Sequence, residues 1–394
     1  MYGLNLDVQP RMRRIRAGFF GALVSCLFFL FPGLATAQNW VWTNEVVDTS
    51  GRGMSLAVDD AGNVHISYGE EKAGLKYGFR QVGLNPAKWF TLALGGGVSY
   101  SHIALDGSGN PAICATYLTL PMRYFHFDGK RWDKQEIAPE DNTSVQAACS
   151  VVITANGTPH VSWYHLTGAI NYAHIRVAEL QNGAWLMRTL DFDVQTGKWH
   201  AMVLDAQGNP CISYDAFVKG LLKFARWDGK KWNIRVVDSR GLHGPDYSLG
   251  MGSSLAFDAH GNVHIVYYSD TEMRHAWQTG DTWKEEVIDN ITPSGSSYDY
   301  RSSLVFDKDG LLHLSYEDSG IAKHAFFDGK EWHVQVIAPS GASASRFSSM
   351  AIDHNQNILY YAYRDAVDGS LRVAVGHKTE TQQTAASDKP QGKN

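Results

Sequence analysis

Short runs of alternating apolar and polar residues, separated by turns rich in Gly and Asn, fill most of the chain. One such run, SLAVDDAGNVHISY from Ser55, returns six more times in altered form. Successive copies begin their first turn 47, 48, 51, 53, 49 and 46 residues apart. The residues that anchor these turns are Asp59, Asp106, Thr154, Asp205, Asp258, Asp307 and Asp353. A repeat of this length, with this alternation, is typical of a β-propeller blade.

Each repeat contains four strand-like segments. In the fifth copy these are SSLAFD, VHIVYY, MRHAWQ and TWKEEVID, which are rich in β-branched and aromatic residues. We expect the tryptophan that opens the fourth segment to pack between adjacent blades. This tryptophan recurs as Trp89, Trp132, Trp185, Trp232, Trp283 and Trp332.

The two ends of the repeat region complement each other. The last copy has only three strand-like segments and lacks the segment that opens on tryptophan. The missing piece stands at the other end of the chain, where WTNEVVD at 42–48 matches WNIRVVD at 232–238. We therefore predict an all-β, seven-bladed β-propeller with four-stranded blades, whose ring is closed by the N-terminal strand.

The N-terminal residues have the composition of an export signal. A basic segment, RMRRIR, precedes an apolar stretch that ends in Ala-Thr-Ala at 35–37. We predict a signal peptide over 1–37, the propeller over 38–377 and a disordered tail over 378–394, where apolar residues are lacking. The expected location is periplasmic or extracellular. A lipoprotein signal ending at Cys26 and an uncleaved membrane anchor remain alternatives.

The net charge and the cysteine content limit the kinds of ligand and partner that we expect. A net charge of −5 does not indicate nucleic acid, and no membrane contact is expected after signal cleavage. The sequence has no C-x-x-C pair, so no zinc site is predicted. We expect Cys114, Cys149 and Cys211 to be buried small residues, although a Cys114–Cys149 bridge stays open. No cofactor is required, while one metal ion on His102 and His200 is an open alternative.

Strand order assigns the loops to two faces. The turns between first and second and between third and fourth segments share one face, and they are short and repetitive. The longer connections on the other face differ from repeat to repeat, so we expect function there. Histidines that recur at one place in the second segment are expected to be scaffold: His65, His160, His264 and His313.

Several residues on the variable face replace the small residues found at equivalent places. His102 and His200 stand at the start of innermost segments, where side chains line a central funnel. A single histidine there is usually structural, but two together suggest a catalytic role. Arg52, Arg301 and Arg346 come from adjacent repeats and can converge on a carboxylate or sulfate. Further candidates for contacting a sugar or transferring a proton are Tyr100, Tyr300, Trp199, Tyr247 and Glu317.

The third-to-fourth turns carry a family resemblance. DGKRW from Asp128, DGKKW from Asp228 and DGKEW from Asp328 resemble the Asp-box (BNR) turn of sialidase-like propellers. Here Gly follows Asp immediately, and the leading Ser of that pattern is absent. Because the turn is structural in that family, the resemblance implies architecture rather than activity. The chain is also similar in architecture to secreted seven-bladed propellers such as ulvan lyases, whose sites use His, Tyr and Arg.

The favoured hypothesis is a polysaccharide lyase that acts on uronate-containing glycans. β-Elimination needs a cation on the uronate carboxylate, a base and an acid. We expect Arg301 and Arg346 to bind the carboxylate, His102 or His200 to abstract the proton, and Tyr100 or Tyr300 to donate one.

Three alternatives stay open. A sialidase-like hydrolase would use Arg52, Arg301 and Arg346 with a Tyr/Glu pair that includes Glu317. A glycan-binding lectin and a protein-docking propeller are the others. The polar positions differ between repeats, which favours one central site over the repeated pockets of a lectin.

Overall fold

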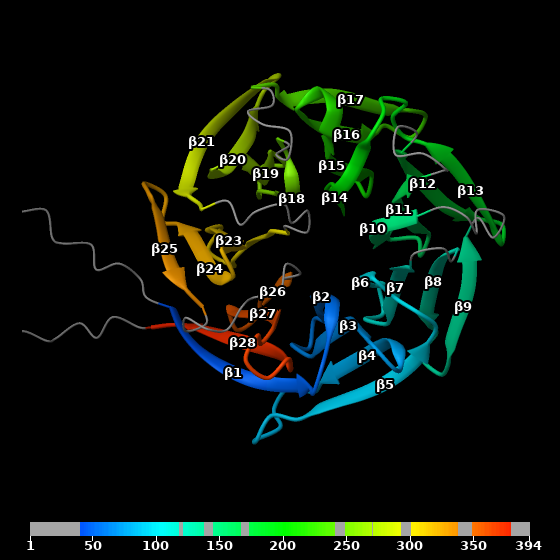
Figure 1. Ribbon diagram of the computed structural model, residues 1–394, viewed down its shortest axis with the longest axis vertical. Coiled ribbons are helices and arrows are strands. Elements are labelled where there is room, and N and C mark those ends of the chain that lie inside the picture. Colours follow the sequence, from blue (N-terminus) through cyan, green and yellow to red (C-terminus); the bar gives the residue numbers. More distant parts are fainter. Residues whose placement is uncertain are drawn as a thin grey trace, which may run out of the picture. The chain divides into compact units, whose positions relative to one another are not determined.

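The computed structural model describes residues 40–117, 121–137, 145–166, 173–240, 249–269, 271–292, 301–337 and 349–379. All of them belong to the compact unit Gln38–Asn394. They form seven four-stranded antiparallel sheets arranged as blades around a central channel (Figure 1). The predicted seven-bladed propeller is therefore confirmed. The predicted signal peptide lies outside the described residues.

The strands form four layers, from the channel to the rim. The innermost strands are β2 (Arg52–Val58), β6 (Tyr100–Leu105), β10 (Val145–Ile153), β14 (Thr196–Leu204), β18 (Met251–Phe257), β22 (Ser303–Phe306) and β26 (Ser349–Asp353). The second strands are β3 (Val64–Glu70), β7 (Pro111–Thr116), β11 (Pro159–Leu166), β15 (Pro210–Ala216), β19 (Val263–Ser269), β23 (Leu312–Asp318) and β27 (Ile358–Arg364). The third strands are β4 (Gly74–Arg80), β8 (Met122–Phe127), β12 (Ala173–Gln181), β16 (Leu221–Trp227), β20 (Glu272–Thr279), β24 (Ile321–Phe327) and β28 (Leu371–Lys378). The outer strands are β5 (Trp89–Gly95), β9 (Trp132–Ile137), β13 (Ala184–Thr189), β17 (Trp232–Asp238), β21 (Thr282–Asn290), β25 (Trp332–Val336) and β1 (Trp40–Asp48).

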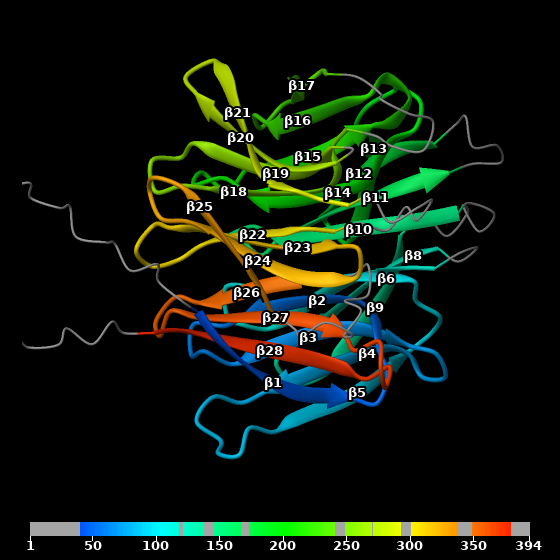
Figure 2. The ribbon, with the colours of Figure 1, turned by 60° about the vertical axis from the view of Figure 1, so that its left-hand side comes forward.

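Blades 1 to 6 each use four consecutive strands, beginning with β2 to β5, and blade 7 combines β26, β27 and β28 with β1. β1 pairs antiparallel with β28, so the N-terminal strand closes the ring as predicted (Figure 2). Trp42 pairs with Gly376, and a Cβ atom at Gly376 would lie 2.8 Å from the Trp42 ring. Only glycine leaves room for the indole at this junction.

Apolar side chains hold adjacent blades together. Seven buried clusters occur among the described residues. Six draw their core from two neighbouring blades, and the cluster between blades 5 and 6 also includes Trp199 of blade 4. The tryptophan that opens each outer strand packs against one of these clusters, as predicted. The cluster between blades 7 and 1 shows the pattern, with Trp89 packed against Val47, Ile66 and Tyr360.

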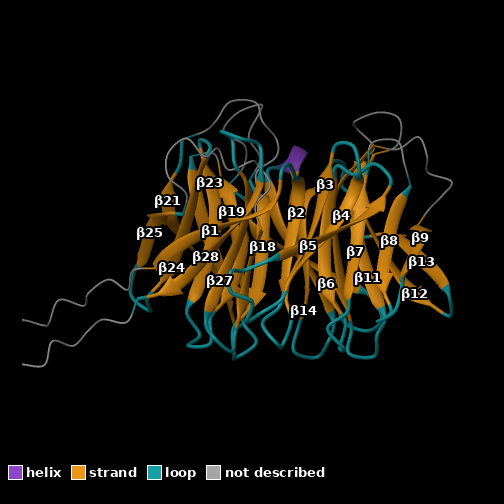
Figure 3. Cartoon of the chain, turned by 90° about the horizontal axis from the view of Figure 1, so that it is seen from below, coloured by secondary structure: helices purple, strands orange, loops and turns teal. Residues whose placement is uncertain are grey.

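The anchor aspartates close the turns between first and second strands. Asp59 accepts the backbone N–H groups of Ala61 at 3.0 Å and Asn63 at 2.8 Å through one carboxylate oxygen. Asp106, Asp205, Asp258 and Asp307 repeat this arrangement. An aspartate that bonds its own turn fixes the hairpin geometry. These turns line one face of the ring, where Figure 3 shows a row of short loops.

A second polar network ties the blades together near the other face. The Tyr316 hydroxyl donates to Asp289 at 2.6 Å, and Lys323 Nζ donates to the same carboxylate at 2.8 Å. Asp289 belongs to blade 5, whereas Tyr316 and Lys323 belong to blade 6. The same Tyr–Asp contact occurs at three other junctions: Tyr68–Asp48, Tyr214–Asp191 and Tyr267–Asp238. This repeated network was not predicted from the sequence.

The cysteines are buried and unpaired. Cys114, Cys149 and Cys211 are free thiols, so no Cys114–Cys149 bridge forms. Apart from the short 3-10 turn η3 (Phe217–Lys219), the described residues are strands and connections. None of them forms a helix long and apolar enough to cross a membrane.

Candidate functional site

A cavity of about 80 Å³ occupies the channel between the innermost strands. Its wall is rich in serine, because most blades place a serine four residues before the anchor. Ser55, Ser150, Ser254 and Ser349 accept the backbone N–H of the next blade, at Ile103, Met202, Leu304 and Leu56, with distances of 3.0–3.3 Å. A small hydroxyl thus links each of these inner strands to its neighbour.

His102 replaces serine at this position in blade 2. Its Nδ1 accepts the N–H of Val151 in blade 3 at 3.2 Å, the bond that serine makes elsewhere. A backbone N–H can only donate, so Nδ1 carries the lone pair and the neutral ring holds its proton on Nε2. Burial, then the charges of Arg301 and His200, lower the pKa of His102 to about 4. His102 is therefore a neutral hydrogen-bond donor at its free nitrogen.

His200 has the opposite tautomer. Its Nδ1 lies 2.8 Å from the carbonyl oxygen of Gly197, which can only accept, so the proton is on Nδ1. Nε2 is buried and has no hydrogen-bond partner among the described residues. Burial is the main cause that lowers the pKa of His200 to about 4, and the charge of Arg301 acts in the same direction. The ring is neutral and keeps one nitrogen unprotonated.

Arg301 crosses the channel. It comes from blade 6, immediately before β22, and its guanidinium carbon lies 5.5 Å from the centre of the Tyr100 ring in blade 2. Both side chains are half-buried. Among the described residues, no carboxylate forms an ion pair with Arg301. Arg301, His102 and His200 line the cavity, and Tyr100 lies beside Arg301.

Trp199 lies at the channel but has little free surface. Its side chain is 4% exposed and packs with Met251, Tyr268 and Leu304 in a core cluster. The Trp199 backbone N–H donates to Asp215 at 3.0 Å, and burial raises the pKa of Asp215 to about 7. The expectation that Trp199 offers a face for stacking on a sugar does not fit this burial. Its backbone instead holds a buried carboxyl group beside the channel.

Glu317 is also an internal residue. It is 5% exposed, and its carboxylate accepts the N–H of Gly320 at 2.5 Å. Its own N–H donates to the hydroxyl of Tyr268 at 2.9 Å. Glu317 therefore shapes the turn between β23 and β24, which does not fit the expected contact with a substrate.

The remaining predicted residues divide into two groups. Arg52 is exposed at the start of β2, and no contact brings it to Arg301. Arg346, Tyr247 and Tyr300 lie outside the described residues. Of the three arginines predicted to form one site, Arg301 is the one that the structure places in the channel.

The recurring histidines act as scaffold. His65 Nε2 lies 3.4 Å from the anchor Asp59, and His313 Nε2 lies 3.3 Å from the anchor Asp307. In blade 6, His313 Nδ1 and His324 Nε2 are 3.0 Å apart, with parallel rings. These contacts join the turn to the third strand inside one blade.

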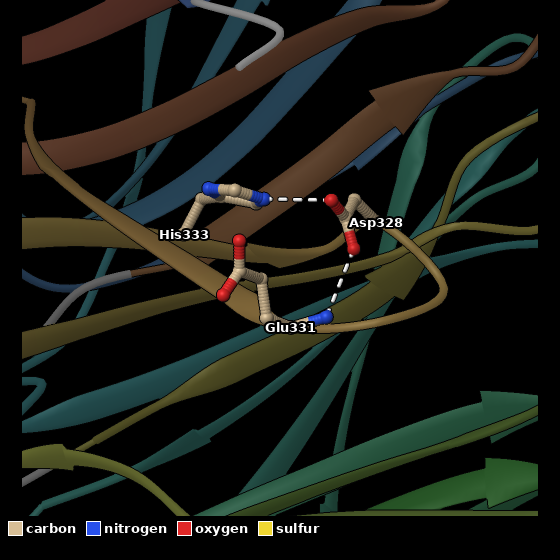
Figure 4. Close-up of side chains that lie close together, drawn as sticks. All are labelled: Asp328, Glu331 and His333. Atoms are coloured by element: carbon tan, nitrogen blue, oxygen red, sulfur yellow. Dashed lines mark hydrogen bonds and ion pairs between the residues drawn. The ribbon is translucent and has the colours of Figure 1, made fainter. Parts of the chain in front are cut away.

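One group of described residues is close enough to hold a metal ion, and it lies away from the channel. Asp328, Glu331 and His333 place ligand atoms within 4.8 Å of one another on the β24–β25 turn (Figure 4). However, His333 Nε2 bonds Asp328 at 2.8 Å, as Asn233 bonds Asp228 at 2.8 Å on the equivalent turn of blade 4. The contact is a repeated element of the turn. His102 and His200 do not belong to such a group among the described residues.

The channel site combines one guanidinium, one phenol and two neutral imidazoles. A guanidinium binds a carboxylate or sulfate through paired hydrogen bonds. The phenol and the Nε2–H of His102 add donors, and the phenol can also transfer a proton. The raised pKa of Asp215 depends on burial, which the repeat pattern of the sequence does not reveal.

Comparisons with known proteins bear on the fold. No protein-family model and no curated protein sequence matches the chain. Solved structures do match. One is an ulvan lyase bound to a saccharide of glucuronate and sulfated rhamnose, with a TM-score of 0.55, 12% identity, and coverage of 83% of this chain and 94% of that chain.

Two further structures also match the chain. A polysaccharide lyase has a TM-score of 0.53 at 10% identity, covering 83% of this chain and 90% of that one. A lectin of Aleuria aurantia in complex with a fucose-containing disaccharide has a TM-score of 0.51 at 13% identity, covering 75% of this chain and all of that one. At these identities the likeness shows the propeller fold alone.

Proposed function

We propose that the protein binds an acidic, uronate-containing polysaccharide at the channel and cleaves it by β-elimination. The observation that carries this proposal is the position of Arg301, which extends from blade 6 to Tyr100 of blade 2 beside a cavity. A guanidinium in that place can bind the uronate carboxylate and stabilise the negative charge that grows on it as the C5 proton leaves. The N-terminal composition adds the proposal that the protein acts outside the cytoplasm.

In this mechanism Tyr100 transfers the proton. In its phenolate form, with Arg301 beside the ring, it takes the proton from C5. The electron pair of the C–H bond forms the C4–C5 double bond, and the bond from C4 to the glycosidic oxygen breaks. Tyr100 then returns the proton to the leaving oxygen. Every atom is accounted for without a cofactor.

The histidines take different roles from those expected. His102 uses Nδ1 between the blades, so its Nε2–H can donate to the substrate but cannot accept the C5 proton. His200 has an unprotonated Nε2, but that nitrogen is buried. Tyr100 is half-buried and lies beside Arg301, so we assign the proton transfer to it.

The test is ultraviolet absorbance of the unsaturated product while the purified protein is mixed with a panel of uronic-acid polysaccharides. A rise is expected, and Tyr100→Phe should lower the rate by about 100-fold or more because the proton transfer is lost. Arg301→Ala should weaken both rate and binding, whereas Arg301→Lys should recover part of the binding. Unchanged activity in Tyr100→Phe would rule out the assigned role.

A second candidate is a glycan-binding protein without catalysis. It is favoured because both imidazoles use Nδ1 to bond backbone groups, as structural residues do. Binding of acidic glycans that depends on Arg301, without any unsaturated product, would support this alternative over the lyase.

A further inference from the structure

A groove of about 400 Å³ lies between blades 3 and 4, at the face that carries the first-to-second turns. It is bordered by the turns at Thr154 and Gly208 and continues into a smaller apolar pocket. The two share His160, Glu179 and Trp227. This groove is separate from the channel residues described above.

The junction around the groove differs from three of the other junctions. In three other junctions, the residue three positions after the opening tryptophan accepts the indole N–H of the next blade. These contacts are Trp89–Glu45 at 2.9 Å, Trp185–Gln135 at 3.0 Å and Trp332–Glu286 at 2.9 Å. Blade 3 has Arg188 at this position, and a guanidinium cannot accept a hydrogen bond. The structural bond is therefore replaced by a cation.

Arg188 is held in place by two neighbours. It forms an ion pair with Glu179 at 3.0 Å, and its guanidinium carbon lies 5.0 Å from the centre of the Trp227 ring. Trp227 lies in turn 5.7 Å from Trp232, centre to centre. The side chains of Glu179 and His160 are each 15% exposed. The result is a fixed aromatic and charged wall at the side of an open groove.

The chemistry of this wall selects the class of ligand. Indole rings bind the apolar faces of sugars, while carboxylate, guanidinium and amide groups bind their hydroxyls. The pairing of Arg188 with Glu179 cancels their charges, and burial lowers the pKa of His160, which keeps it neutral. Such a wall has no net charge with which to attract an acidic sugar. Amides at the rim come from Asn156, Gln181, Gln207 and Asn209.

The neighbouring groove between blades 2 and 3 provides a contrast. It is smaller, about 230 Å³, and Leu180 stands where blade 4 has Trp227. Gln135 takes the place of Arg188 there and bonds Trp185. The groove between blades 2 and 3 therefore lacks this aromatic and charged wall.

We propose that the groove between blades 3 and 4 is a second carbohydrate site, which binds a neutral sugar residue against Trp227. The proposal goes beyond the proposed function, because it concerns a different face and a ligand of different charge. A site of this kind would let the protein hold a neutral part of a glycan independently of the channel.

The experiment is saturation-transfer NMR on the folded protein with a panel of neutral methyl glycosides, together with a titration of tryptophan fluorescence. At least one glycoside is expected to bind, and Trp227→Ala should weaken it by about tenfold or more. Leu180→Ala in the neighbouring groove is the matched control and should bind normally. Binding should also persist in Arg301→Ala, which separates this site from the channel.

Arg188→Gln gives a variant that keeps the fold. It restores at blade 3 the acceptor that Gln135 supplies in blade 2, so thermal unfolding should stay close to the parent protein while sugar binding falls. The proposal is overturned if no neutral glycoside binds, or if binding survives Trp227→Ala and Arg188→Gln but is lost in Arg301→Ala.

Discussion

His102 accepts the backbone N–H of Val151 at 3.2 Å, in the place where four other blades use a serine hydroxyl. The histidine is therefore part of the ring's internal bonding and also a channel residue. Serine makes the same bond with a much smaller side chain. The structural role of His102 can be separated from its role in the channel by substitution with serine, because serine makes the same bond in other blades.

The first prediction compares His102→Ser with His102→Ala. The serine variant keeps an acceptor for Val151, so its free energy of unfolding should stay close to that of the parent protein. The alanine variant leaves a buried N–H without a partner and should lose about 1–3 kcal/mol. Both should lose affinity for acidic glycans, because both lack the Nε2–H. Urea unfolding and glycan binding test this, and equal stability of the two variants would contradict it.

The second prediction concerns Asp215. Burial raises its pKa to about 7 from an ordinary value near 4, so the folded chain holds this proton more tightly than the unfolded chain. The stabilisation is complete below pH 4 and is lost as the pH rises toward 7, at up to about 1.4 kcal/mol per pH unit. Asp215→Asn should remove this loss. The difference in melting temperature between variant and parent should therefore change in the variant's favour from pH 5 to pH 8.

The exposed residue Asp60 provides the control for that experiment. Asp60→Asn should follow the parent protein across the same range. A constant difference between Asp215→Asn and the parent would show that the Asp215 carboxyl does not hold a proton in the fold.

The third prediction tests ring closure. Gly376→Ala places a methyl group about 2.8 Å from the Trp42 ring, so the strand from the N-terminus must shift. We expect a loss of about 1–3 kcal/mol. Gly107→Ala should be nearly neutral, because no atom lies within 4 Å of its added carbon. Thermal unfolding of both proteins measures the difference, and equal melting temperatures would argue against a close Trp42 contact.

The fourth prediction tests the polar network between blades. Asp289→Asn weakens the contacts to Tyr316 and Lys323, and we expect a loss of about 1–3 kcal/mol in unfolding free energy. Asp309→Asn affects only surface pairs, with Lys308 and Lys378, and should cost less than about 1 kcal/mol. A similar effect of both substitutions would mean that the network contributes no more than a surface ion pair.

The fold could be predicted because the sequence pattern of one blade is repeated seven times. The spacing of the anchor residues, the recurring tryptophans and the missing last strand each indicate a seven-bladed propeller independently. The channel residues were found for the complementary reason, since Arg301 and His102 break a repeated pattern. Tautomers were out of reach, because they depend on which backbone group each imidazole meets.

Burial explains the residues that were assigned differently. Trp199 stands near the start of an inner strand, like Tyr100 and Arg301. Its side chain nevertheless packs toward blade 5 and is buried in the core. The sequence position gives the strand but not the neighbour to which a large side chain turns. The Tyr–Asp network was visible as an aspartate ending the fourth segment, at Asp48, Asp238 and Asp289, but its partners lie in the next blade.

The pairing of β1 with β28 also decides how the ring would respond to mechanical force. Trp40 is the register partner of Lys378, so the chain enters and leaves the propeller at the same end of one antiparallel ladder. Tension between these two points would load that ladder one residue pair at a time, beginning at Trp40 and Lys378, instead of shearing all its hydrogen bonds together. Blade 7 is therefore where a pulled chain would unzip first, while the other six blades are still closed.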